Sequence, residues 1–167
     1  MFDAHFKILN RRVGPGEPCL IIGEAGVNHF GDLEKGKDLV DMVTESGADV
    51  FKTQAFSTDQ LISNSLPSWK NRMRSKEVDL EFLQTLKERC DRQGLVFMCT
   101  AHDQLALNWL KKLDVVAHKI GSGEKENYEF IRQHAETNKP LIISTGMQDK
   151  KGIRETVRCV ENTDNTK

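Results

Sequence analysis

The sequence lacks the long apolar runs and the one-sided charge that are typical of membrane and nucleic-acid-binding proteins. No apolar run approaches the roughly 18 residues that suggest a membrane span. The 24 Lys and Arg residues nearly balance the 25 Asp and Glu residues, for a net charge of −1. The N-terminus also lacks the apolar core of a signal peptide. We therefore expect a soluble, cytoplasmic protein that binds neither membranes nor nucleic acid.

Cysteine is also scarce, and no two of the 4 cysteines have the close spacing of a metal site. Cys19 and Cys99 lie in apolar stretches that read as strands, so we predict that both thiols are buried and inert. A disulfide is not expected in a reducing compartment.

The sequence does contain a repeated pattern in which a short apolar strand precedes an amphipathic helix. Strands are expected near residues 19–24, 49–54, 95–100, 115–120 and 140–145. Helices are expected between Asp32 and Gly47, over residues 79–93, 103–112 and 127–137, and from residue 152. Alternating strands and helices predict an α/β fold with a parallel sheet and right-handed crossovers.

Five such units do not close a (β/α)₈ barrel, which needs about 250 residues. We interpret residues 1–167 as the first five units of a partial TIM (β/α) barrel, with a small hairpin over residues 5–14. A five-stranded open flavodoxin-like sheet is the structural alternative, although no glycine-rich phosphate loop opens the first helix. The polar stretch 57–78 is expected to be irregular, either as a solvated loop or as a flap whose positive charges attract an anion.

Polar side chains follow the apolar part of each predicted strand. They are Glu24, Lys52, Gln54, Thr100, Lys119, Ser122, Glu124 and Ser144. Because the carboxyl ends of parallel strands meet at one edge of a sheet, where α/β folds bind their ligands, we expect these side chains to converge.

Two lysines at equivalent strand ends give the sharpest signal. An ammonium group in a buried strand, as at Lys52 and Lys119, is costly unless it is paired with an anion. A lysine at a sheet edge that extends its charge into water is the structural alternative. Together with the nearby hydroxyl groups, the two lysines suit a small molecule with both a carboxylate and a phosphate. Glu24 and Glu124 add groups suited to proton transfer or to binding sugar hydroxyls.

The segments that carry these residues resemble the sialic acid synthase (NeuB) family over residues 6–155. The matching segments are Glu24–His29 with Gly31-Asp32, Gly47-Ala48-Asp49 before Lys52-x-Gln54, Lys119–Glu124, and Lys139-Pro140 before Ser144–Met147. Two segments depart from the family pattern. Cys99-Thr100-Ala101-His102 replaces a Ser-Thr-Pro-Phe type of sequence, and Thr53 is unusual between Lys52 and Gln54.

The resemblance implies an enzyme that condenses phosphoenolpyruvate with N-acetylmannosamine or a related N-acylamino sugar, and that releases phosphate. It implies that Glu24 is catalytic and that Gln54 and Glu124 contact the sugar. The positions that it assigns to phosphoenolpyruvate are Lys52, Thr100, Lys119, Ser122 and Ser144. Asn28 and His29 belong to the same signature, where fixing a loop and contacting a ligand are equally good interpretations.

The resemblance also implies parts that this chain does not contain. Family members bind a divalent cation, Mn²⁺ or Mg²⁺, through two histidines on later strands. They form homodimers in which a C-terminal antifreeze-like domain reaches the neighbouring site. We predict no metal ligand within residues 1–167. His118 alternates with Lys119 along its strand, so we predict that it is structural. The fragment alone is therefore expected to be inactive.

Two other functions stay open at this point. One is a Schiff-base aldolase that uses Lys52 or Lys119 as its nucleophile. The other is a non-catalytic binding module, because the chain has neither the later strands nor the metal ligands.

Overall fold

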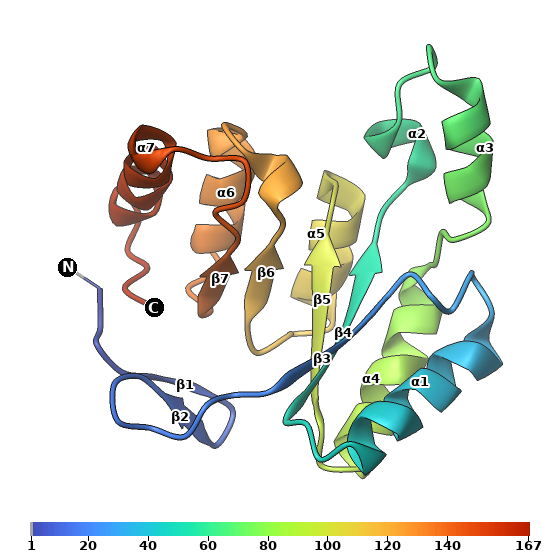
Figure 1. Ribbon diagram of the computed structural model, residues 1–167, viewed down its shortest axis with the longest axis horizontal. Coiled ribbons are helices and arrows are strands. Elements are labelled where there is room, and N and C mark those ends of the chain that lie inside the picture. Colours follow the sequence, from blue (N-terminus) through green and yellow to red (C-terminus); the bar gives the residue numbers. More distant parts are fainter. Residues whose placement is uncertain (1) are drawn as a thin grey trace. The chain divides into compact units, whose positions relative to one another are not determined.

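The structure, a computed structural model, describes residues 2–167, which form two compact units. The central unit comprises residues 20–115, and the terminal unit joins residues 2–19 to residues 116–167. Figure 1 labels the helices and strands of both. None of the helices in the described chain is long and apolar enough to cross a membrane.

The central unit contains three parallel strands, β3 (Ile22–Gly26), β4 (Val50–Ala55) and β5 (Val96–Ala101). Its helices are α1 (Leu33–Glu45), α2 (Thr58–Leu61), α3 (Pro67–Arg74), α4 (Leu80–Arg92) and α5 (Gln104–Lys112). β4 and β5 agree with the predicted strands to within one residue. β3 starts later than predicted, because the Ile21 amide donates to the Asp49 carboxylate at 2.8 Å instead of joining the ladder.

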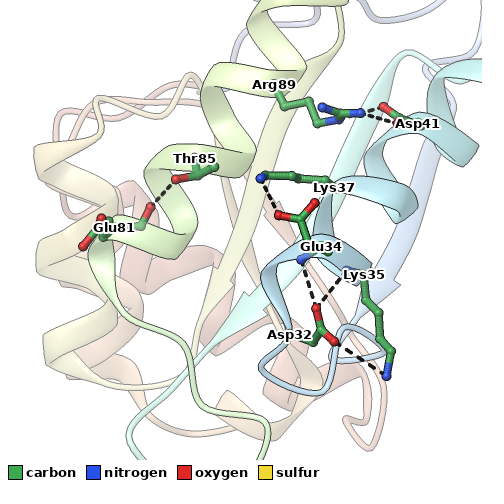
Figure 2. Close-up of polar contacts among 8 residues, drawn as sticks. All are labelled: Asp32, Glu34, Lys35, Lys37, Asp41, Glu81, Thr85 and Arg89. Carbon is green, nitrogen blue, oxygen red and sulfur yellow. Dashed lines mark hydrogen bonds and ion pairs between the residues drawn. The ribbon is translucent and has the colours of Figure 1, made fainter.

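Aspartates begin three of these helices, as the sequence pattern predicts for helix starts. Asp32 accepts hydrogen bonds from the amides of Glu34 and Lys35, at 3.0 and 3.2 Å. Figure 2 shows this cap at the start of α1. Asp79 and Asp103 cap α4 and α5 in the same manner. Each carboxylate satisfies amides that lack partners inside the helix and lies at the positive end of the helix dipole.

Helices α1 and α4 pack closely against each other and against the sheet. Gly36 makes the approach possible, since a Cβ atom there would lie 3.1 Å from both Leu86 and Phe82 of α4. At the solvent-facing side of the contact, Arg89 forms an ion pair with Asp41, with Nε 2.8 Å from the carboxylate (Figure 2). A close contact at Gly36 and a bidentate ion pair therefore hold α1 and α4 together.

The packing of α1 shows which face of the sheet is free of helices. A Cβ atom on Gly23 would lie 2.7 Å from Val43 of α1, so residue 23 faces the helix layer. Side chains alternate along a strand. Glu24 therefore points to the opposite face, and the register places it beside Lys52 of β4.

The prediction of an irregular loop over residues 57–78 is wrong, because α2 and α3 form there. Pro67 stands in the first turn of α3, where its fixed φ angle favours a helix. The Asp59 carboxylate forms ion pairs with the Lys70 ammonium group at 2.8 Å and with the Arg74 guanidinium group at 2.9 Å. The positive run is thus partly neutralised within the segment.

The terminal unit contains two pairs of strands. β1 (Phe6–Ile8) and β2 (Arg11–Val13) form the predicted antiparallel hairpin. β6 (His118–Ile120) and β7 (Leu141–Ile143) are parallel, as predicted, but shorter than expected. The helical elements are the 3₁₀ turn η1 (Ser122–Glu124), α6 (Tyr128–Ala135) and α7 (Lys150–Glu161). A small core of Ile120, Ile131, Ala135 and Val160 joins β6 to α6 and α7.

The two cysteines that were predicted to be buried differ in their exposure to solvent. Cys99 is fully buried, so its predicted burial is confirmed, and this burial raises the pKa of its thiol. Cys19 is exposed, and that prediction is wrong. It precedes the start of β3, in a segment that the apolar pattern had assigned to the strand.

Candidate functional site

Four of the predicted site residues meet in the central unit, and we call them the Lys52 cluster: Glu24, Lys52, Gln54 and Thr100. The Lys52 side chain is 11% exposed and forms an ion pair with the Glu24 carboxylate. Its ammonium group also donates to the Thr100 hydroxyl at 3.3 Å. The Gln54 amide donates to the other Glu24 oxygen at 3.2 Å. The carboxylate is thus held from two sides by its neighbours on β4.

Strand register explains why these side chains meet. Glu24 pairs with Lys52 across β3 and β4, and Gln54 pairs with Thr100 across β4 and β5. A register shift follows directly after the carboxylate, because Gly26 and not Ala25 pairs with Thr53 of β4. The unusual Thr53 points to the other face of β4, where its hydroxyl donates to the Gly26 carbonyl at 2.9 Å. Thr53 therefore braces the backbone beside the cluster.

The other four predicted site residues lie in the terminal unit, and we call them the Lys119 cluster: Lys119, Ser122, Glu124 and Ser144. Lys119 donates to the Ser144 hydroxyl at 2.6 Å and to the Ile120 carbonyl at 2.7 Å. Ser122 packs under the backbone of the next loop, since a Cβ atom on Gly146 would lie 3.2 Å from its Cβ. Lys119 and Ser144 are thus brought into direct contact, at the ends of adjacent strands.

Glu124 lies on η1 and not on a strand, because the chain turns directly after Gly121. Its side chain is buried, and Oε2 accepts a hydrogen bond from the Asn127 amide at 2.8 Å. Sequence reasoning did not find Asn127. The signal available was the spacing of three residues between a carboxylate and an amide, directly before α6.

The histidine beside Lys119 is structural, as predicted. His118 is 1% exposed, and its ring meets that of His134 edge-on with the centroids 5.3 Å apart. His134 packs in turn on Phe130 at 4.5 Å. His118 and Lys119 point to opposite faces of β6 because side chains alternate along a strand.

We also tested whether the described residues fit a divalent cation. Over residues 2–167, no group of three or more His, Cys, Asp or Glu side chains is arranged to hold a metal ion. The carboxylate of Glu24 is already engaged by Lys52 and Gln54. These residues therefore do not make a cation site by themselves.

Comparison with known proteins gives a family and several relatives. A family model described as NeuB matches residues 39–167. An N,N'-diacetyllegionaminic acid synthase of Legionella pneumophila is 36% identical over 89% of this chain and 45% of its own length. The human N-acetylneuraminate-9-phosphate synthase is 30% identical over 90% of this chain and 45% of its own. The chain thus spans about half the length of the curated relatives it matches.

A solved structure supports the same assignment. The N-acetylneuraminic acid synthetase of Leptospira borgpetersenii, in complex with citrate, superimposes with a TM-score of 0.93 at 26% identity. The match covers 97% of this chain and 56% of that one. The predicted fold class, the first five β/α units of a TIM barrel with an N-terminal hairpin, is confirmed.

Proposed function

This chain belongs to the NeuB family, and from that premise we propose that the full-length protein is a sialic acid-type synthase. It condenses phosphoenolpyruvate with an N-acylamino sugar, N-acetylmannosamine or a related one, and releases phosphate. The product is a nonulosonate. A divalent cation, Mn²⁺ or Mg²⁺, and a homodimer belong to the same proposal. The cation's ligands would lie outside residues 2–167, so we assign no step to it.

The ion pair between the buried Lys52 side chain and the more exposed Glu24 carboxylate is the observation that carries this proposal. Removing the Lys52 ammonium group from water is costly, and an ion pair with a partner as exposed as Glu24 gains little stability. A pair retained beside the hydroxyl of Thr100 is therefore better explained by ligand binding than by folding alone. Lys119 with Ser144 repeats the combination of cation and hydroxyl in the terminal unit. Phosphoenolpyruvate carries two anionic groups, and both lysines are among the positions that the family resemblance assigns to this substrate.

The proposed chemistry follows from these contacts. An arriving anion competes with Glu24 for the Lys52 ammonium group, and the displaced carboxylate becomes free to move a proton. Attack of C3 of phosphoenolpyruvate on the sugar aldehyde forms the new C–C bond and leaves positive charge at C2. Water adds there, and the C–O bond to phosphate then breaks. The lysines stabilise the charge of the departing phosphate, and Gln54 and Glu124 offer an amide and a carboxylate to the sugar.

The test is phosphate release by the full-length protein with phosphoenolpyruvate, with and without N-acetylmannosamine and with and without Mn²⁺. We expect release that requires both the sugar and the cation. Release that ignores both would contradict the proposal. Borohydride treatment in the presence of pyruvate is the control for the aldolase alternative, because only a Schiff base on lysine is trapped.

A further inference from the structure

A fully buried histidine lies in the turn directly after the Lys52 cluster. We call residues 27–31 the signature turn, which connects β3 to α1. His29 is 0% exposed within it. The Asp32 amide closes the turn by donating to the His29 carbonyl at 2.9 Å, and Asp32 then caps α1 (Figure 2).

The hydrogen bonding of the ring fixes its protonation state. His29 Nδ1 accepts a hydrogen bond from the Gly31 amide at 3.0 Å. A nitrogen that accepts carries no proton, so the ring proton of the neutral tautomer is on Nε2. Nε2 is buried without a hydrogen-bond partner among the described residues, and the ring packs on Phe82 with the centroids 4.9 Å apart. Burial lowers the pKa of His29, which also favours the neutral ring.

One side of the signature turn contacts the segment that follows α3. Gly31 has a φ angle of +75°, and a Cβ atom there would lie 2.9 Å from the Ser75 carbonyl. Lys76 lies over the Phe30 ring at 5.4 Å from its centroid. The hydrogen bond from the Gly31 amide to His29 Nδ1 therefore holds the turn in a conformation that only glycine can adopt at position 31.

The other side leads directly to the Glu24 carboxylate. Gly26, with a φ angle of +57°, ends β3 and starts the chain toward the turn. A Cβ atom at Gly26 would lie 3.6 Å from Glu24 Oε1 and 3.7 Å from the Gln54 amide nitrogen. A small movement of this backbone would therefore change the space around the carboxylate.

We infer that His29 is a positioning residue whose Nδ1 atom, by holding the signature turn, keeps the backbone at Gly26 where Glu24 can act. This inference rests on the proposed function. His29 is buried, and its ring accepts a hydrogen bond from the Gly31 amide. Its effect is thus exerted through the turn and not on a substrate.

Three substitutions in the full-length protein test this role. His29→Asn places an amide oxygen near the position of Nδ1 and keeps an acceptor for Gly31. His29→Gln places its polar atoms near the position of Nε2, and His29→Leu keeps the volume but no acceptor. We expect kcat for phosphate release to fall roughly ten- to hundredfold in the Gln and Leu variants. We expect the Asn variant to stay within a few-fold of the wild type and KM for phosphoenolpyruvate to change little in all three.

The pattern of rescue separates positioning from packing. If the Leu variant matches the wild type, or if the Asn variant falls as far as the Gln variant, the inference is wrong. NMR gives a second test that does not depend on the reaction. It would measure the ¹⁵N chemical shifts of the His29 ring and the hydrogen-exchange rate of the Gly31 amide. An Nε2–H tautomer and a protected Gly31 amide are expected. An Nδ1–H tautomer would overturn the inference even if the wild-type protein proves to be a synthase. If the wild-type protein releases no phosphate, the proposed function fails while the tautomer still decides the role of His29 in the turn.

Discussion

Lys52 and Lys119, the two lysines of the candidate site, have different contacts in the two units. Lys52 in the central unit is paired with the carboxylate of Glu24, whereas Lys119 in the terminal unit donates to the Ser144 hydroxyl and the Ile120 carbonyl. An anionic ligand at Lys52 must compete with the Glu24 carboxylate, and one at Lys119 would lie beside the Ser144 hydroxyl. We therefore propose that ligand binding changes the state of Glu24, and that the Lys52 cluster carries more of the chemistry than the Lys119 cluster.

The largest expected effect comes from comparing the two carboxylates. Glu24→Gln in the full-length protein should lower kcat by about 10²- to 10⁴-fold, the range for losing a general acid or base. Glu124→Gln should act mainly on KM for the sugar, because the Asn127 amide holds the Glu124 carboxylate in place. Steady-state phosphate release with each substrate varied in turn measures both. Equal effects on kcat in the two variants would remove the distinction between the clusters.

A glycine in each unit tests how tightly the backbone near each cluster is packed. Gly23→Ala should destabilise the protein by about 1–3 kcal/mol, a typical cost of overpacking, because its Cβ atom would lie 2.7 Å from Val43. Gly123→Ala is the matched control, since a Cβ atom there has no neighbour within 4 Å. Urea unfolding of the two variants measures the difference. A Gly23 variant as stable as the Gly123 variant would show that α1 moves away freely.

The buried histidine of the central unit should make the protein sensitive to moderate acid. Burial lowers the pKa of His29 in the folded state. The unfolded chain then takes up the proton first, so stability falls as the pH drops below about 6.5, the pKa of an unperturbed histidine. Thermal unfolding between pH 8 and pH 5 should show a smaller decrease in His29→Asn than in the wild type. The same decrease in both would mean that other groups cause it.

The smallest expected effect lies in the segment with α2 and α3. Ion pairs with Arg74 and Lys70 lower the pKa of Asp59 to about 2. A depressed carboxyl pKa gives stability at neutral pH that is lost as the pH falls from about 3.9, the unfolded value, toward the folded one. Because the group is exposed, Asp59→Asn should change overall stability very little. An NMR titration of the Asp59 carboxyl group that gives an ordinary pKa would show that the pairs do not persist in solution.

Much of the fold was predictable because local signals and long-range packing agree. Asp32, Asp79 and Asp103 begin helices as their types predict, and the apolar runs of β4 and β5 set those strands to within one residue. The prediction failed where one side chain changed a local outcome. Asp49 captures the Ile21 amide and delays β3, and Asp59 neutralises the charges that had suggested a loop at α3.

The candidate site was predictable as a set of residues but not as a set of contacts. Alternation along β3 and β4 places Glu24, Lys52 and Gln54 on one face, as expected. The pairing of Glu24 with Lys52 depends on register, which no single strand encodes. The support that Asn127 gives to Glu124 depends on the 3₁₀ turn, which was read as the end of a strand.

Titration of phosphoenolpyruvate into the full-length protein tests the central claim most directly, that Lys52 and Lys119 belong to the positions that bind this substrate. Calorimetry would compare the wild type with Lys52→Met and Lys119→Met, and with Lys35→Met as a surface control, because the Lys35 side chain is 60% exposed. We expect binding to weaken by roughly thirtyfold or more in each cluster variant and to be unchanged in the control. Unchanged affinity in both cluster variants would contradict the account.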